Sequence, residues 1–184
     1  KGESSDLVFI DADLSYESDA VAKLLSYDRD IVAGLYPMKK DEEEYPARVL
    51  GVKPDSDFCP PKVDPETGLI ELDGAPTGFM RIRRNVFETM IEKFPERKFR
   101  EPWKRNGGEP RTGHDLFACE RVGDQWFGED LRFCHLAIEA GFKIWGVPNL
   151  NFTHVGRKAW AGNWHEYLLR QPGGSKAGNG QNLL

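Results

Sequence analysis

Residues 6–13, with the sequence DLVFIDAD, decide the fold of this 184-residue chain. Four consecutive apolar, β-forming residues that end at an aspartate are typical of a fully buried strand in a parallel-type sheet. In an α/β sheet, ligands gather at the carboxyl ends of the strands. The stretch therefore predicts an α/β protein whose candidate site begins at Asp11 and Asp13.

Helix and strand patterns alternate after this strand. Residues 19–27 carry apolar side chains at helical spacing, and residues 31–36 form a second buried strand before Pro37, which predicts a right-handed βαβ unit. Residues 39–68 predict a long surface segment, and residues 95–114 a loop. Further strands are expected at 69–72, 79–82, 143–147 and 151–155, and helices at 84–93 and 129–140, the last closed by Gly141.

The domain is expected to span residues 1–160, with a flexible segment at 161–184 and disorder at 173–181, because Gly, Asn, Gln and Trp dominate after Gly156. Hydrophobic content of 39%, charged content of 30% and a net charge of -5 indicate a folded globular chain. The interspersed charges argue against a general nucleic-acid binder.

No apolar run approaches the roughly 20 residues that span a bilayer, so no transmembrane segment is expected. The first residues do not resemble a signal peptide. The three cysteines, Cys59, Cys119 and Cys134, form no Cys-x-x-Cys pair and suit a reducing compartment. These features predict a cytoplasmic protein without a structural zinc site.

The acidic pair after the first strand suits a hard cation. Carboxylates bind Mg²⁺ or Mn²⁺, and such an ion also binds phosphate oxygens. The Asp-x-Asp spacing occurs three times, at residues 11–13, 28–30 and 55–57, so the spacing alone decides little. Only the first pair follows a predicted buried strand. The alternative is that Asp11 is a turn residue that caps the next helix.

Four blocks of sequence, in order over residues 6–156, carry a resemblance to a known family. They are residues 6–13 with 30–39, residues 74–82 (GAPTGFMRI), residues 127–134 (FGEDLRFC), and residues 141–148 with 154–156. These blocks resemble GT-A glycosyltransferases. The similarity extends to the large inverting family two and to fungal Golgi mannosyltransferases. It implies a mixed sheet flanked by helices, and transfer of a sugar from a nucleotide-diphosphate donor to a glycan or other hydroxyl acceptor.

The resemblance also implies site roles. Asp13 would bind the metal directly, and Asp11 would contact the donor ribose or a metal-bound water. His154 would be a further metal ligand, which favours Mn²⁺ over Mg²⁺ because imidazole suits manganese better. The alternative for His154 is a strand-end histidine with a satisfied hydrogen bond.

Glu129 and Asp130 are the expected catalytic residues. If the enzyme inverts, Asp130 is the general base, with Glu129 the second candidate. If it retains configuration, the pair would bind the acceptor or stabilise an oxocarbenium-like state. The alternative is that both carboxylates merely favour a helix N-terminus, where the macrodipole stabilises negative charge.

Gly74 and Gly78 are expected to let the backbone approach the donor sugar, or else to form an ordinary turn. Lys39 and Arg157, with Lys40 and Lys158, could bind the diphosphate, or could be solvated surface charges. Four tryptophans add binding surfaces: a segment holding Trp160 and Trp164 could close over the donor, and Trp103 and Trp126 could serve the acceptor, although Trp126 also suits core packing.

The chain departs from the family at its start, which lies ten residues ahead of Asp11. The fold is therefore expected to lack the first βα units, which hold the nucleotide base. Residues 7–10 would then form a sheet edge, open to self-association or to a partner chain. Two other classes stay open: a non-catalytic glycan- or nucleotide-binding module, and a haloacid-dehalogenase-type phosphatase, which also has Asp-x-Asp after a buried strand.

Overall fold

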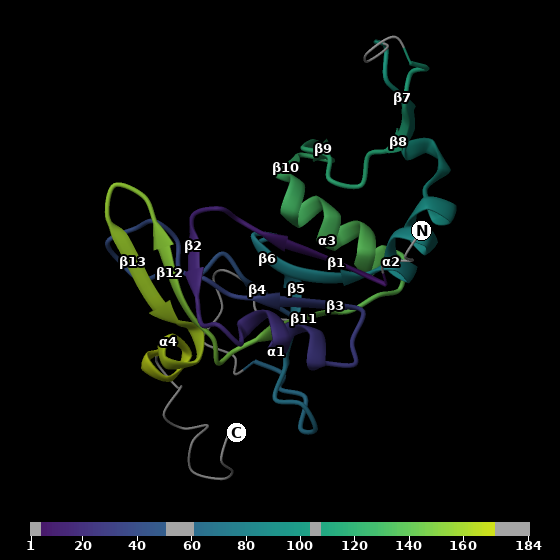
Figure 1. Ribbon diagram of the computed structural model, residues 1–184. Coiled ribbons are helices and arrows are strands. Elements are labelled where there is room, and N and C mark those ends of the chain that lie inside the picture. The colour runs from purple at the N-terminus through teal and green to yellow at the C-terminus, as the bar shows by residue number, and fades with distance from the viewer. Residues whose placement is uncertain (1–4, 51–60, 104–107, 172–184) are drawn as a thin grey trace.

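The computed structural model describes residues 5–50, 61–103 and 108–171. Its body is a six-stranded mixed sheet with helices on both faces (Figure 1). Strands β3 and β11 pair in parallel, and the other neighbouring pairs are antiparallel. The predicted α/β class with a mixed sheet is confirmed. In spatial order the strands are β1 (Asp6–Ile10), β6 (Phe79–Arg83), β3 (Ile31–Gly34), β11 (Ile144–Val147), β5 (Ile70–Gly74) and β4 (Arg48–Val49).

Alternation along the strands divides the core between the two faces of this sheet. Ile31 and Ala33 of β3 pack in one cluster with α2 (Arg84–Lys93) and α3 (Glu129–Glu139), whereas Val32 joins the cluster under α1 (Ala20–Ser26). Figure 1 shows α1 on one side of the sheet and α2 and α3 on the other. Helix α3 ends before Gly141, whose φ of 104° places it in the left-handed region, as the sequence predicts.

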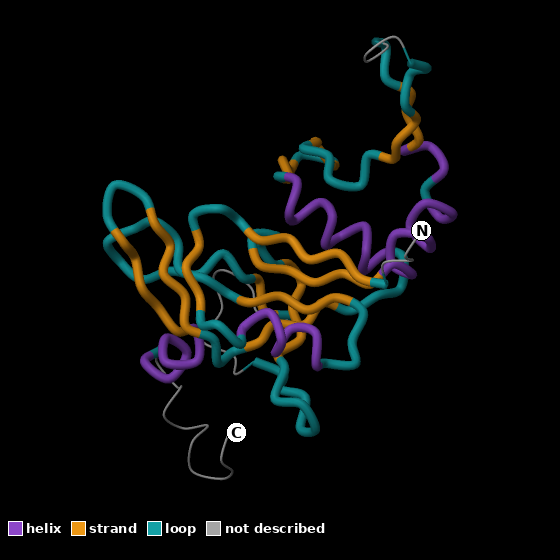
Figure 2. Tube along the Cα trace, viewed as in Figure 1, coloured by secondary structure: helices purple, strands orange, loops and turns teal. Residues whose placement is uncertain are grey.

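A second, three-stranded sheet lies beside the first (Figure 2). It has the order β13 (Ala159–Asn163), β12 (Asn151–Val155) and β2 (Leu14–Tyr16). Phe152 joins the two sheets, because its ring packs 5.0 Å from the ring of Phe79 in β6. The chain that leaves β1 enters β2 within a few residues. Asp11 and Asp13 therefore lie at the junction of the two sheets.

The prediction that β1 is fully buried is wrong. This strand is at the edge of the sheet, where Leu7 and Ile10 are 45% and 42% exposed. It is not the parallel neighbour of β3, because β6 lies between them and is antiparallel to both. A short apolar run does not reveal which distant segment will pair with it. The expected sheet edge is present in the part of the chain that the structure describes, and self-association there stays a prediction.

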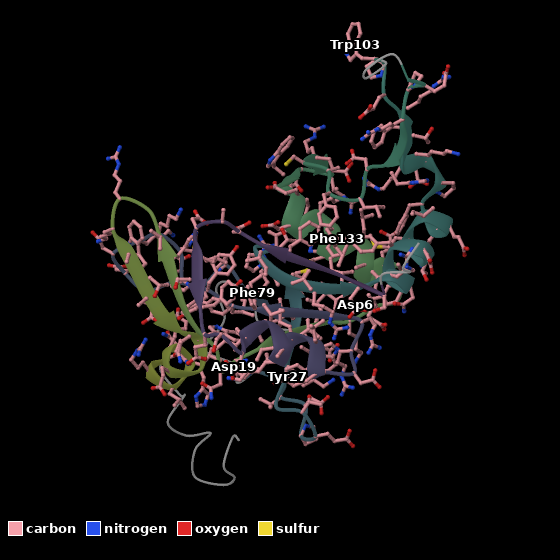
Figure 3. All side chains as sticks on the ribbon, viewed as in Figure 1. Asp6, Asp19, Tyr27, Phe79, Trp103 and Phe133 are labelled. Atoms are coloured by element: carbon pink, nitrogen blue, oxygen red, sulfur yellow. The ribbon has the colours of Figure 1, made fainter. Side chains whose placement is uncertain are left out.

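Residues 95–114, predicted as a loop, begin an arm that projects from the body. The arm contains a short 3-10 helix at Pro95–Arg97 and a hairpin of β7 (Lys98–Arg100) and β8 (Thr112–His114), and a second hairpin of β9 (Glu120–Val122) and β10 (Gln125–Phe127) leads to α3. Figure 3 shows Phe79 and Phe133 inside the body and Trp103 at the far end of the arm, where it is 78% exposed.

The segment expected to be flexible from residue 161 is partly ordered. Strand β13 pairs with β12 along its length, so the expected boundary at residue 160 falls inside a strand. Helix α4 (Trp164–Arg170) follows, and the indole of Trp164 is only 2% exposed in the core. Tryptophan burial outweighs the polar composition around it. The disorder expected at 173–181 lies outside the described residues.

The expected surface segment 39–68 contributes only β4 and an isolated bridge between Val63 and Ile70 among the residues described. Within the described ranges, the structure contains no helix with the length and hydropathy that crossing a membrane requires.

Candidate functional site

Asp13 brings three separate segments together. Its backbone carbonyl accepts a hydrogen bond of 2.8 Å from the N–H of Val155, which fixes the loop against the end of β12. Its carboxylate oxygen Oδ2 lies 2.5 Å from Lys39 Nζ and 3.6 Å from His154 Nε2. The predicted approach of Asp13 to His154 is thus present, although 141 positions separate the two residues in the sequence (154 less 13).

The imidazole of His154 is oriented by its other nitrogen. Nδ1 lies 2.9 Å from the carbonyl oxygen of Pro37, and because a carbonyl only accepts, Nδ1 carries the proton and donates. In the neutral ring, Nε2 then keeps a lone pair directed toward Asp13. A metal-binding histidine is commonly held in this way, with its second nitrogen bonded to a backbone carbonyl.

The charge of Lys39 stabilises the carboxylate of Asp13. The hydrogen bond from Lys39 is the main cause that lowers the pKa of Asp13 below its ordinary value, with smaller contributions from the charge of Lys39 and, when its ring is protonated, that of His154. Asp13 is partly exposed to solvent, so its charge is open to exchange between cations. Lys39, expected either at the diphosphate or as a free surface charge, instead pairs with a predicted metal ligand.

The turn between β5 and β6 organises a second group of acidic side chains. The N–H of Asp11 donates to the carbonyl of Gly78 at 2.8 Å, and the hydroxyl of Tyr36 donates to the Asp11 carboxylate. A Cβ on Gly78 would lie 2.2 Å from Asp11 Oδ2 and 2.3 Å from the Tyr36 hydroxyl. Gly78 is therefore required for this contact, since any side chain would displace one of these two groups.

Asp130 lies in the first turn of α3 and completes this group. Its carboxylate accepts hydrogen bonds from the hydroxyl and the backbone N–H of Thr77, in the same turn as Gly78. Burial is the main cause that raises the pKa of Asp130 above its ordinary value, and the charges of Glu129 and Asp11 raise it further. Burial, with the charges of Asp11 and Asp130, also raises the pKa of Tyr36. Asp11, Tyr36 and Asp130 are therefore electrostatically coupled.

Glu129 has a different environment from Asp130. Its exposed carboxylate accepts a hydrogen bond of 3.1 Å from the thiol of Cys119, and this bond is the main cause that lowers the pKa of Glu129. Of the two candidate bases, only Asp130 is partly withdrawn from solvent and has a raised pKa. The burial of Asp130 and the direction of the two pKa shifts thus favour Asp130 over Glu129 as the group that takes a proton.

Three other predicted residues have distinct surroundings. The space beside Gly74 is filled, because a Cβ there would lie 2.6 Å from Leu131 of α3, so this glycine permits helix packing. Arg157 is exposed in the turn between β12 and β13. Trp126 is 70% exposed, so the interpretation that it packs in the core is wrong. Sugar contact by Gly74 and diphosphate contact by Arg157 stay predictions.

The pair of Asp13 and His154 fits a divalent cation only if other ligands come from a bound substrate and water. Among the described residues, no group of three or more His, Cys, Asp or Glu side chains is placed to hold a metal by itself. Asp13 and His154 form a pair, and their 3.6 Å separation is near the ~3.0–3.5 Å expected of two neighbouring ligands on one small cation. Mg²⁺-type ions are commonly held by one or two carboxylates together with substrate phosphates. The pair therefore fits a metal whose remaining ligands come from a bound diphosphate and water.

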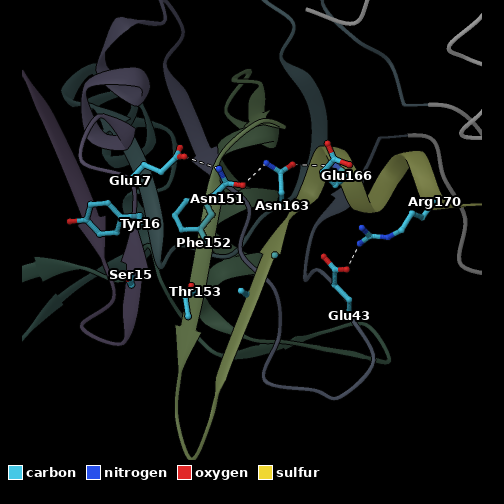
Figure 4. Close-up of a pocket in the computed structure, with 12 residues that line it drawn as sticks. Ser15, Tyr16, Glu17, Glu43, Asn151, Phe152, Thr153, Asn163, Glu166 and Arg170 are labelled. Atoms are coloured by element: carbon cyan, nitrogen blue, oxygen red, sulfur yellow. Dashed lines mark hydrogen bonds and ion pairs between the residues drawn. The ribbon is translucent and has the colours of Figure 1, made fainter.

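An open, polar hollow of about 520 Å³ lies elsewhere on the three-stranded sheet (Figure 4). Ser15 and Thr153 are cross-strand neighbours among its lining residues. Its polar side chains bond to one another, through Asn151 with Glu17, Asn163 with Asn151, and Arg170 with Glu43. Asp13, Lys39 and His154 are not among the residues that line the hollow, so it is not part of the site at Asp13.

Sequence reasoning missed three contributors: the hydroxyl of Tyr36, the carbonyl of Pro37 and the side chain of Thr77. Tyr36 and Pro37 lie two and three residues after the end of β3 at Gly34, and Asp11 directly follows β1. The rule that ligands gather at strand ends applies to both strands and could have identified Tyr36. Pro37 contributes through its backbone, which its residue type does not reveal.

No family model matches this chain, and no curated protein matches it. Among solved structures, it is similar to A197 from STIV, a viral protein, with a TM-score of 0.46 and 19% sequence identity. The similarity covers 88% of this chain and 63% of A197. At this distance the likeness carries no argument about family or activity.

Proposed function

We propose that this chain is the metal- and acceptor-binding part of a GT-A glycosyltransferase, which transfers a sugar from a nucleotide diphosphate to a hydroxyl acceptor. The observation that carries the proposal is the convergence of Asp13 and His154. Asp13 Oδ2 faces His154 Nε2 at 3.6 Å, and the bond from Nδ1 to Pro37 fixes the orientation of the ring. This arrangement joins the acidic pair after the first strand to the histidine that the family resemblance singles out.

Asp13 and His154 would hold Mn²⁺ or Mg²⁺ together with the diphosphate. When bound, the cation would neutralise the negative charge that develops on the leaving diphosphate. The carboxylate of Asp11 accepts a hydrogen bond from Tyr36, and its charge raises the pKa of Asp130. Asp11 therefore has a different role from Asp13. Asp11 would therefore orient a hydroxyl group of the donor, which agrees with the ribose contact that the resemblance implies.

Asp130 is the proposed group that acts on the acceptor. Its raised pKa makes it a better proton acceptor than an ordinary aspartate, and the two hydrogen bonds from Thr77 fix its direction. If transfer inverts the sugar, Asp130 takes the proton of the acceptor hydroxyl. If transfer retains configuration, Asp130 binds the acceptor or stabilises the cationic sugar.

The architecture also supports the GT-A proposal. A mixed sheet carries the acidic pair at the carboxyl end of β1, and a small sheet places His154 beside it. The turn at residues 75–78 lies between the acidic pair and the first turn of α3, so it contacts both proposed halves of the site. Ligand sites at strand ends are the general rule for open α/β sheets.

The test is release of nucleoside diphosphate from a panel of nucleotide sugars, measured with and without Mn²⁺. We expect Mn²⁺-dependent hydrolysis by the full chain, and loss of at least ~100-fold in Asp13→Ala and His154→Ala. Asp28→Ala is the matched control, because Asp28 belongs to another Asp-x-Asp and is held on the surface by Arg83. Equal donor binding by the wild type and Asp13→Ala, with and without metal, would contradict the metal-dependent function. Metal-dependent binding without turnover would favour a non-catalytic binding module.

A further inference from the structure

The side chain of Lys39 is 37% exposed, and its stem lies against the turn after β12. A Cβ on Gly156 would lie 3.3 Å from Lys39 Cδ and 3.6 Å from Lys39 Cε, so the aliphatic stem of the lysine covers this glycine. The same position would lie 3.0 Å from the ring of Trp160. The turn after β12 thus leaves room for the lysine stem, and the stem directs the ammonium group toward Asp13.

One oxygen of Asp13 faces two competing groups. Oδ2 accepts the bond from Lys39 Nζ at 2.5 Å, and the same oxygen faces His154 Nε2. A divalent cation bound between Asp13 and His154 would need this oxygen. It would also be repelled by the ammonium group beside it, because like charges at a few ångströms disfavour each other. The lysine and the cation therefore exclude each other at Asp13.

The neighbouring lysines do not compete in this way. Lys40 pairs with Glu44, and Lys158 pairs with Asp41, so each has a surface carboxylate of its own. Neither contact involves a predicted metal ligand. Lys39 therefore differs from its neighbours in the group to which it is bound, although all three are lysines on adjoining surface segments.

We propose that Lys39 is a positioning residue that exchanges partners when the donor binds. Without donor it pairs with Asp13; when the cation and the diphosphate bind, it leaves Asp13 and its ammonium group binds a phosphate oxygen. This inference rests on the proposed function. The packed stem keeps the freed ammonium group within reach of the site, and lysine is a common phosphate ligand that acts as a point charge.

The exchange predicts opposite effects of one substitution on two ligands. In the full chain, Lys39→Met should bind Mn²⁺ alone about three- to tenfold tighter than the wild type, because the competing charge is gone. The same variant should bind the preformed Mn²⁺–pyrophosphate complex about tenfold more weakly, because it lacks the phosphate contact. Mn²⁺ binding can be followed by electron paramagnetic resonance, and the pyrophosphate complex by titration calorimetry.

Lys40→Met is the matched control, since it removes the same charge from the next residue. It should change neither affinity by more than about twofold, because its partner Glu44 is a surface carboxylate. Lys39→Arg, which keeps the charge, should leave the affinity for Mn²⁺ alone close to that of the wild type. Thermal unfolding of each variant checks that the fold is kept.

The possible outcomes separate the inference from the proposed function. If wild type and Lys39→Met bind Mn²⁺ equally and His154→Ala does not, the exchange is overturned and the metal site stands. If the wild type and Lys39→Met both fail to bind Mn²⁺ and its pyrophosphate complex, the inference and the metal-dependent function both fall. Tighter Mn²⁺ binding with unchanged pyrophosphate binding overturns the transfer of Lys39 to phosphate.

Discussion

Two acidic regions start from the same short loop but differ in how their charge is handled. The Asp13 region, with Lys39 and His154, is partly open to solvent and its carboxylate is balanced by a cation. In the Asp130 region Asp11 is exposed but Asp130 is partly buried, and burial, with the charges of Glu129 and Asp11, raises the pKa of Asp130. An exposed, balanced carboxylate suits the exchange of one cation for another, whereas a crowded, desolvated carboxylate suits the uptake of a proton.

The largest expected effect separates the two regions by function. Asp130→Asn should lower kcat for sugar transfer by about 10³-fold, because an amide cannot accept the acceptor proton. Donor binding with Mn²⁺ should be nearly unchanged, because Asp13 and His154 are untouched. Steady-state kinetics and donor titration measure the two quantities. Glu129→Gln is the control and should cost less than about tenfold, since Glu129 faces Cys119; a larger loss for Glu129→Gln would assign the base to that residue.

A second substitution should disturb the turn that the Asp130 region depends on. Gly78→Ala would place a methyl group 2.2 Å from Asp11 Oδ2, and overpacking of this kind typically costs about 1–3 kcal/mol of the free energy of unfolding. We also expect activity to fall by more than the loss of folded protein explains, because Asp11 and Tyr36 must move.

Gly74→Ala provides the comparison for Gly78→Ala. Its methyl group would meet Leu131 in the packing of α3, so we expect a similar loss of stability. The activity per folded molecule should nevertheless be close to that of the wild type. Denaturant unfolding and kinetics on both variants test this contrast. Equal specific activities for the two variants would show that the close contact at Gly78 has no functional role.

The sequence predicts the elements of this fold better than their arrangement. Helix α2 and strand β12 occupy the residues expected of them, because regular periodicity and clear boundaries define both. The neighbour of β1 could not be predicted, since β1 pairs with β6, which lies about 70 residues later in the sequence. The hairpin of β7 and β8 was missed because its strands have three residues each and little alternation.

In the candidate site, likewise, the sequence predicts the residues better than their contacts. Aspartates at the end of a strand and a histidine at the end of another could be identified from residue type and position. The pairing of Lys39 with Asp13 could not be identified from the sequence, because a surface lysine has many possible partners. The contribution of the Pro37 carbonyl could not be identified either, because every residue carries a carbonyl and only the fold decides which one faces His154.

The two regions should also respond to pH with opposite signs. Folding raises the pKa of Asp130, so its stabilising contribution is present below its ordinary pKa and is lost as pH rises through the raised value. Folding lowers the pKa of Asp13, so its contribution is present above its ordinary pKa and is lost as pH falls through the lowered value.

Neutral substitutions should therefore change the free energy of unfolding in opposite directions. At pH 7, Asp130→Asn should stabilise the protein relative to the wild type, and this gain should vanish near pH 3. Asp13→Asn should destabilise it slightly at pH 7, with a smaller effect near pH 3, because the carboxylate is then increasingly protonated in the wild type. Denaturant unfolding at both pH values measures the differences. The same sign for both variants at pH 7 would remove the electrostatic distinction between the regions.

The smallest expected effect locates the acceptor relative to the Asp130 region. Trp126 lies four residues before Asp130 and is 70% exposed, so its ring is free to stack on a sugar without a cost to the core. Trp126→Ala should raise KM for the acceptor about three- to tenfold and change the free energy of unfolding by less than ~0.5 kcal/mol. Trp103→Ala is the matched control, because Trp103 is also highly exposed but lies at the far end of the arm. An increase in KM for Trp103→Ala alone would place the acceptor along the arm instead, and would leave Asp130 without a nearby sugar to deprotonate.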